Sequence, residues 1–73
     1  MNAITIVDAR GLSCPQPALL TRQAIDQLKQ GRLEVLVDSG TSRDNVARTA
    51  EKAGWRVTAE DTPEGGFRLN LEK

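Results

Sequence analysis

The sequence predicts a two-layer α/β sandwich, an α+β arrangement with two helices on one face of a four-stranded mixed sheet. Two observations lead to this fold class. Strand-like and helix-like segments follow one another in the order βαβαββ along 73 residues, and each strand-like segment after the first has one apolar and one largely polar face. Such a sheet is covered by helices on its apolar face alone, and right-handed crossovers bring both helices there. Residues 1–73 are therefore expected to form a single domain.

The first half of the chain provides a strand, a helix and a second strand. Residues 4–7 are rich in β-branched side chains, which predicts a strand. Between residues 15 and 30, apolar residues recur at helical spacing, with Leu19 as an exposed exception, and Gly31 is a suitable stop. Residues 33–37 then show an alternating pattern that predicts the second strand.

The second half provides a helix and a hairpin. Ser42 is the expected N-cap of the helix and Gly54 its stop. An apolar stripe runs between them, made of Val46, Ala47, Ala50 and Ala53. Residues 55–59 and 67–71 predict two strands, and residues 63–66 (PEGG) predict the turn that joins them. The tryptophan at the start of the first of these strands is expected in the core.

Composition excludes several classes of function. Ten basic and ten acidic residues cancel, so no single-sign field points to a nucleic-acid or anionic-membrane surface. One Trp and one Phe are too few for a platform that stacks bases. No apolar run is long enough to span a membrane, and the N-terminus does not resemble a signal peptide. We expect a cytoplasmic protein with no direct nucleic-acid partner and no membrane partner.

The missing residue types narrow the chemistry further. The chain has no histidine and one cysteine, which excludes a Cys–His nucleophile pair, the usual zinc site and a CxxC dithiol within it. Neither a Walker A lysine motif nor a GxGxxG motif is present. We therefore expect no cofactor and no metal.

The single cysteine, Cys14, is the candidate catalytic residue. Pro15 suits the first helical position and Pro17 still falls in the first turn, which puts Cys14 at or next to the N-cap. A thiolate is favoured there by the positive end of the helix dipole. On these residues alone, an inert buried cysteine and a reactive thiol are equally supported. A reactive thiol without a neighbouring base can still accept sulfur as a persulfide and pass it on.

Residues 8–17, DARGLSCPQP, resemble the CPxP signature of the TusA/SirA-like sulfur carriers. Asp8, Gly11, Cys14, Pro15 and Pro17 match its pattern. The resemblance implies a fold like the C-terminal domain of translation initiation factor 3. It also implies that the cysteine takes sulfur as a persulfide from a cysteine desulfurase or another donor protein. The sulfur would then pass to a downstream acceptor protein, for tRNA thiolation or for sulfur or selenium metabolism.

The second half of the chain points to one branch of that family. TusA proper tends to have Arg-Asp-Ile-Pro at the start of the second helix, whereas this chain has RDNV from Arg43 onward. Residues 37–55 look closer to the YedF-like branch, which is associated with selenium metabolism. The same thiolate would accept sulfur or selenium, so the sequence leaves the cargo open.

Four other residues are candidates for supporting roles. Asp8 and Arg10 are expected to pair and to shape the loop, a role in conformation more than in stability. Arg43 and Asp44 match the family's Arg-Asp pair and could orient the loop or contact a partner. A solvated first helical turn explains them at least as well. Asp44 is also spaced to pair with Arg48, four residues further along the helix.

A different class of function also fits the sequence. The predicted fold is like that of a ribosome-binding domain, so a non-catalytic regulatory or RNA-associated interaction module is the alternative. Fold alone does not assign function, and the zero net charge argues against RNA.

Overall fold

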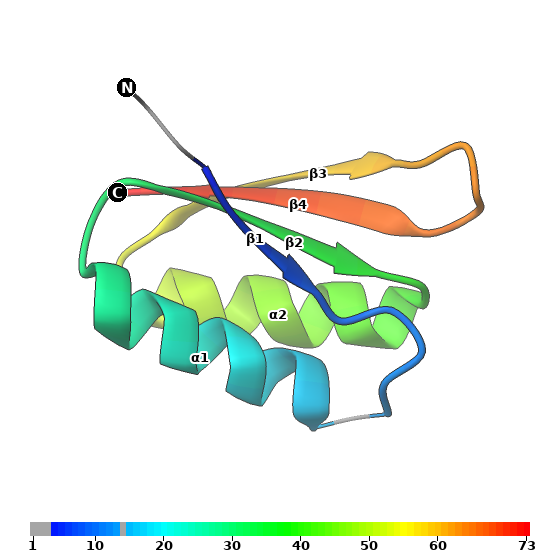
Figure 1. The fold of residues 1–73 in the computed structure, drawn as a ribbon, viewed down its shortest axis with the longest axis horizontal. Helices are drawn as coiled ribbons and strands as arrows, with labels where there is room; N and C mark the ends of the chain where they lie inside the picture. Colours follow the sequence, from blue (N-terminus) through cyan, green and yellow to red (C-terminus); the bar gives the residue numbers. More distant parts are fainter. Residues whose placement is uncertain (1–3, 14) are drawn as a thin grey trace.

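The computed structural model describes residues 4–13 and 15–73 and confirms the predicted architecture. The elements are β1 (Thr5–Asp8), α1 (Gln16–Leu28), β2 (Arg32–Val37), α2 (Gly40–Lys52), β3 (Arg56–Asp61) and β4 (Phe67–Glu72). The sheet has the order β1-β2-β4-β3, with β1 parallel to β2 and the other pairs antiparallel. Both helices lie against the same face of this sheet (Figure 1).

The core lies between the sheet and the two helices. Alternate residues of the two central strands, β2 and β4, point toward the helices. They are at most 1% exposed: Leu33, Val35, Val37, Leu69 and Leu71. Ile25 of α1 and Val46 of α2 close the layer, and Trp55 is buried as predicted. Burying apolar surface stabilises a fold by about 25 cal/mol per Å². This layer is therefore the main source of stability.

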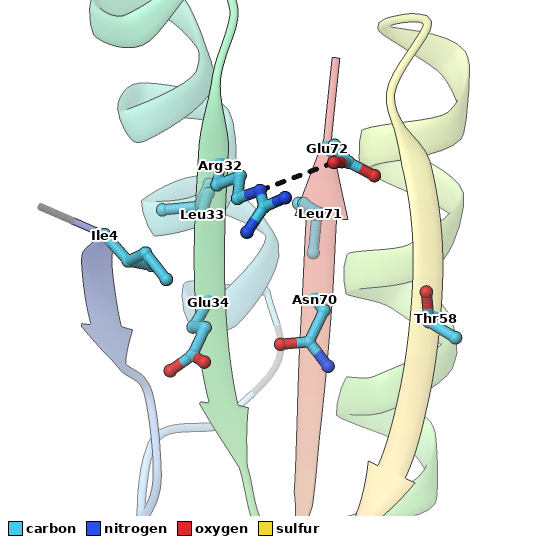
Figure 2. Close-up of a pocket in the computed structure, with 8 residues that line it drawn as sticks. All are labelled: Ile4, Arg32, Leu33, Glu34, Thr58, Asn70, Leu71 and Glu72. Atoms are coloured by element: carbon cyan, nitrogen blue, oxygen red, sulfur yellow. Dashed lines mark ion pairs between the residues drawn. The ribbon is translucent and has the colours of Figure 1, made fainter. Parts of the chain in front are cut away.

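The opposite face of the sheet is open and largely polar, with Ile6 exposed beside Glu34 on the edge strand. The registers bring Glu34, Asn70 and Thr58 side by side across three strands, and these side chains line an open hollow (Figure 2). Arg32 pairs there with Glu72 at 3.4 Å between Nε and Oε2. Exposed pairs of this kind contribute about 0–1 kcal/mol each, so this pair adds little to stability. Within the described residues, no helix is long and apolar enough to cross a membrane.

Helix α1 is shorter at both ends than predicted. It begins at Gln16 with Pro15 as its N-cap, one residue later than expected. It ends at Leu28 because Lys29 already takes a left-handed conformation, with φ of 65°. The glycine stop at Gly31, with φ of 116°, therefore lies in the connection to β2 rather than at the helix end.

The prediction of Ser42 as the N-cap of α2 is wrong. Ser39 is the cap, and its Oγ accepts the backbone N–H of Ser42 at 3.1 Å. Two serines three residues apart both fit the capping pattern. Ser39 alone has the extended backbone that a cap requires, with φ of −144° and ψ of 154°. Ser42 is instead buried inside the first turn.

The β3–β4 turn packs closely on the end of β2. Thr62 Oγ1 accepts the N–H of Gly66 at 3.0 Å, which closes the turn. A Cβ added at Gly66 would lie 2.5 Å from the carbonyl oxygen of Val37. Absence of a side chain at this glycine is therefore what lets the turn approach β2.

Gly66→Ala is expected to lower the free energy of unfolding by about 1–3 kcal/mol, because backbone atoms must move apart. Gly40→Ala is the matched control, since its new Cβ would meet only the Arg43 side chain at 3.6 Å. This variant should unfold at or slightly above the wild-type denaturant midpoint. Urea titrations of both variants test the difference, and equal midpoints would show that the close approach is not required.

Candidate functional site

The predicted site residues gather at one end of the molecule. Cys14 itself lies outside the described residues, so the site is described from the segments on either side of it. The loop that leaves β1, the β2–α2 connection and the β3–β4 turn all lie at the right-hand end of Figure 1. Both helices also begin there, so their positive dipole ends face the same region.

The loop after β1 is anchored at both of its ends. Ala9 is fully buried, and its N–H donates to the Leu36 carbonyl at 2.8 Å, which extends the β1–β2 ladder by one residue. Pro17, beyond the cysteine, is also fully buried. Residues 10–13 and 15–16 between these anchors are all exposed. The described residues on both sides of Cys14 are thus exposed and lie between two buried anchors.

The two prolines have different surroundings. Pro15 is the exposed N-cap, whereas Pro17 belongs to the buried face of α1. Thr21, also fully buried, donates its hydroxyl to the Pro17 carbonyl at 2.9 Å. A buried hydroxyl needs such a partner, and this threonine on the packed helix face was not among the predicted core residues.

Asp8 and Arg10 form the predicted ion pair. Arg10 donates from Nε to Oδ1 at 2.9 Å and from Nη2 to Oδ2 at 2.8 Å. The backbone N–H of Arg10 adds a third bond to Oδ1 at 3.2 Å. The side-chain bonds, followed by the backbone bond, lower the pKa of Asp8 from 3.8 to about 2. The pair closes a tight turn at the start of the loop.

Gly11 connects the loop to the second half of the chain. Its φ of 78° is a left-handed conformation that favours glycine. Its N–H donates to Oδ2 of Asp38 at 2.7 Å. Asp38 was not a predicted site residue. Its place in the sequence could have pointed to it, because Asp38 directly follows β2 and the loop directly follows β1. The carboxyl ends of two parallel strands lie at the same edge of a sheet.

Arg43 and Asp44 lie at the same end but bond to each other. Arg43 Nε is 3.0 Å from Asp44 Oδ1, so the predicted pair between Asp44 and Arg48 is replaced by a neighbouring one. The Arg43 guanidinium also lies over the ring of Phe67, 4.7 Å from its centroid. Within the described part of the chain, the hydrogen bond, ion pair and ring contact of these side chains are with each other and with Phe67, and none of the three involves the loop of residues 8–13.

Charge is distributed unevenly between the two ends of the molecule. At the loop end, Arg10 and Arg43 are outnumbered by carboxylates: Asp8, Asp38, Asp44, Asp61 and Glu64. At the opposite end, the described carboxylates Asp26, Glu51 and Glu72 are outnumbered by cations: Lys29, Arg32, Lys52, Arg56 and Lys73. Within residues 4–13 and 15–73, no group of three or more His, Cys, Asp or Glu side chains could hold a metal ion.

Removal of the Arg10 side chain should return the pKa of Asp8 from about 2 toward 3.8. The carboxylate form is the one that accepts the three bonds, so the depressed pKa means that this pair stabilises the fold above pH 3.8. That contribution is lost as pH falls through about 2. Carbon-13 NMR titration of Arg10→Ala measures the shift, with Arg22→Ala as a control that leaves Asp8 unchanged. An Asp8 pKa still near 2 in Arg10→Ala would contradict this assignment.

Comparison with known proteins covers nearly the whole chain. The family model for sulfurtransferase TusA matches residues 5–73. A protein of Methanocaldococcus jannaschii, provisionally named a sulfur carrier, is 35% identical over 72 residues, which cover 97% of this chain and 96% of that one. YrkI of Bacillus subtilis, named in the same way, is 37% identical over 67 residues, 89% of this chain and 87% of its own.

A solved structure agrees with these sequence matches. The SirA-like protein of Desulfitobacterium hafniense superposes with a TM-score of 0.88 at 29% identity, over 96% of each chain. The protein therefore belongs to the TusA family of sulfurtransferases, the TusA/SirA-like sulfur carriers.

Proposed function

We propose that this protein accepts sulfur as a persulfide on Cys14 from a cysteine desulfurase or another donor protein and passes it to an acceptor protein. The observation that carries the proposal is the loop around the cysteine. Its described residues are exposed between two buried anchors, Ala9 and Pro17. Family membership supplies the chemistry, because the relatives are named as carriers of sulfur.

The proposed transfer needs no residue that the chain lacks. The Cys14 thiolate attacks the outer sulfur of the donor's persulfide. A new S–S bond forms on Cys14, the donor's S–S bond breaks, and the donor cysteine leaves as a thiolate. Delivery repeats the same exchange with an acceptor thiolate, so no external oxidant or reductant is consumed. The thiolate is the nucleophile throughout, which suits a chain without histidine.

The neighbouring residues have roles in this proposal that follow from their positions. Asp8, Arg10 and Gly11 shape the loop, and Pro15 and Pro17 fix the start of α1 behind it. Arg43 and Asp44 lie at the same end of the molecule as the loop and are available to a partner protein, because Asp44 is exposed and Arg43 is only partly buried. We place the relay in the cytoplasm. The acceptor decides whether the cargo serves tRNA thiolation, sulfur metabolism or selenium metabolism. The similarity to YrkI is consistent with the YedF-like branch.

The proposal is tested by intact-protein mass spectrometry after incubation with a cysteine desulfurase and free cysteine. Wild type is expected to gain the mass of one sulfur atom and to lose it on reduction. Cys14→Ser should keep the wild-type circular dichroism spectrum and gain nothing.

Two results would count against the carrier role. Sulfur uptake by folded Cys14→Ser would place the cargo elsewhere. No uptake by wild type, together with resistance of Cys14 to alkylation in the folded state, would show a buried structural cysteine.

A further inference from the structure

Asp38 joins the loop around Cys14 to the second half of the chain. Its Oδ2 accepts the N–H of Gly11, 27 residues earlier, at 2.7 Å. This distance is at the short end of the range for bonds to an ionised acceptor, which are stronger than neutral ones. The bond lies beyond the end of the β1–β2 ladder, whose last backbone link runs from Ala9 N–H to the Leu36 carbonyl. Asp38 thus holds the loop two residues past the point where the sheet stops holding it.

The backbone of Asp38 is itself fixed from two sides. It lies between Val37, which is fully buried, and Ser39, the N-cap of α2. On the other side, the β3–β4 turn packs against it, since a Cβ at Gly66 would come within 3.4 Å of the Asp38 Cα. The carboxylate is therefore presented by a rigid part of the fold, whereas the loop residues that it holds are exposed.

We propose that Asp38 is a positioning residue for sulfur transfer, which acts on Cys14 through the Gly11 N–H. The inference rests on the proposed function, because it concerns the step at which the loop meets a donor or acceptor protein. Persulfide exchange needs the attacking thiolate in line with the S–S bond, so a loop with more conformations reaches that geometry less often. Asp38 limits those conformations without touching the reacting atoms.

The test compares Asp38→Ala and Asp38→Asn with wild type. Asparagine keeps an acceptor oxygen at the same position, and alanine removes it. Asp26→Ala is the matched control, because it removes an exposed carboxylate from a pair with Arg22 on α1. Two quantities are measured: the single-turnover rate of sulfur transfer from a loaded desulfurase, and the exchange rate of the Gly11 amide proton by NMR.

Asp38→Ala is expected to slow sulfur transfer by about 3- to 10-fold, the factor that corresponds to one exposed hydrogen bond, and to speed Gly11 exchange. Asp38→Asn should restore most of both, and Asp26→Ala should change neither. Rescue by asparagine would show that the effect comes from the hydrogen bond to Gly11 and not from the negative charge of Asp38. If Asp38→Ala does not fold, Asp38→Ser, whose hydroxyl is too short to reach Gly11, takes its place with the same expected losses.

Two outcomes overturn the inference while the carrier role stands. One is transfer at the wild-type rate in Asp38→Ala or its serine substitute. The other is an asparagine variant as slow as the alanine variant, which would assign the effect to charge. If wild type itself takes up no sulfur, the proposed function fails, and the positioning role fails with it.

Discussion

The register of β2 is the constraint on which the rest of the structure depends. Its alternate residues must face the helices, because a shift by one residue would turn the apolar set toward water. β2 is also the strand that pairs with both β1 and β4. Fixing β2 therefore fixes where β1 ends and the cysteine-bearing loop begins, and where the β3–β4 turn lies. The loop after β1 and the β3–β4 turn both approach Asp38, the first residue after β2.

The helices complete this arrangement from the other layer. Helix α1 begins directly after the loop, and its second residue, Pro17, is packed into the core. The loop is thus attached to the sheet through Ala9 and to the helix layer through Pro17. If the carrier role proposed above holds, two successive partners would meet a short exposed segment whose ends are held in the core.

The element order, the covered face of the sheet and the motif itself could be predicted from the sequence, because each is written in local periodicity or spacing. The errors arose where one local pattern fits two residues. Ser39 and Ser42 both suit an N-cap, and only the extended backbone at Ser39 decides between them. By spacing, Asp44 can pair with either Arg43 or Arg48. In the structure it pairs with Arg43, whose guanidinium also packs over the Phe67 ring. The contact between Gly11 and Asp38 escaped prediction for another reason. It joins residues 27 apart that are brought together only by parallel strand pairing.

The uneven placement of charge has a consequence for how this protein meets others. With equal numbers of acidic and basic residues, a distant charged surface exerts almost no net pull on the molecule. The carboxylates at the loop end and the cations at the opposite end nevertheless make it an electric dipole. A dipole in a field feels a torque, so a surface of positive potential turns the molecule loop first before any atoms touch. Salt screens this torque beyond about 8–10 Å at physiological ionic strength, which confines the alignment to the last moments of an encounter.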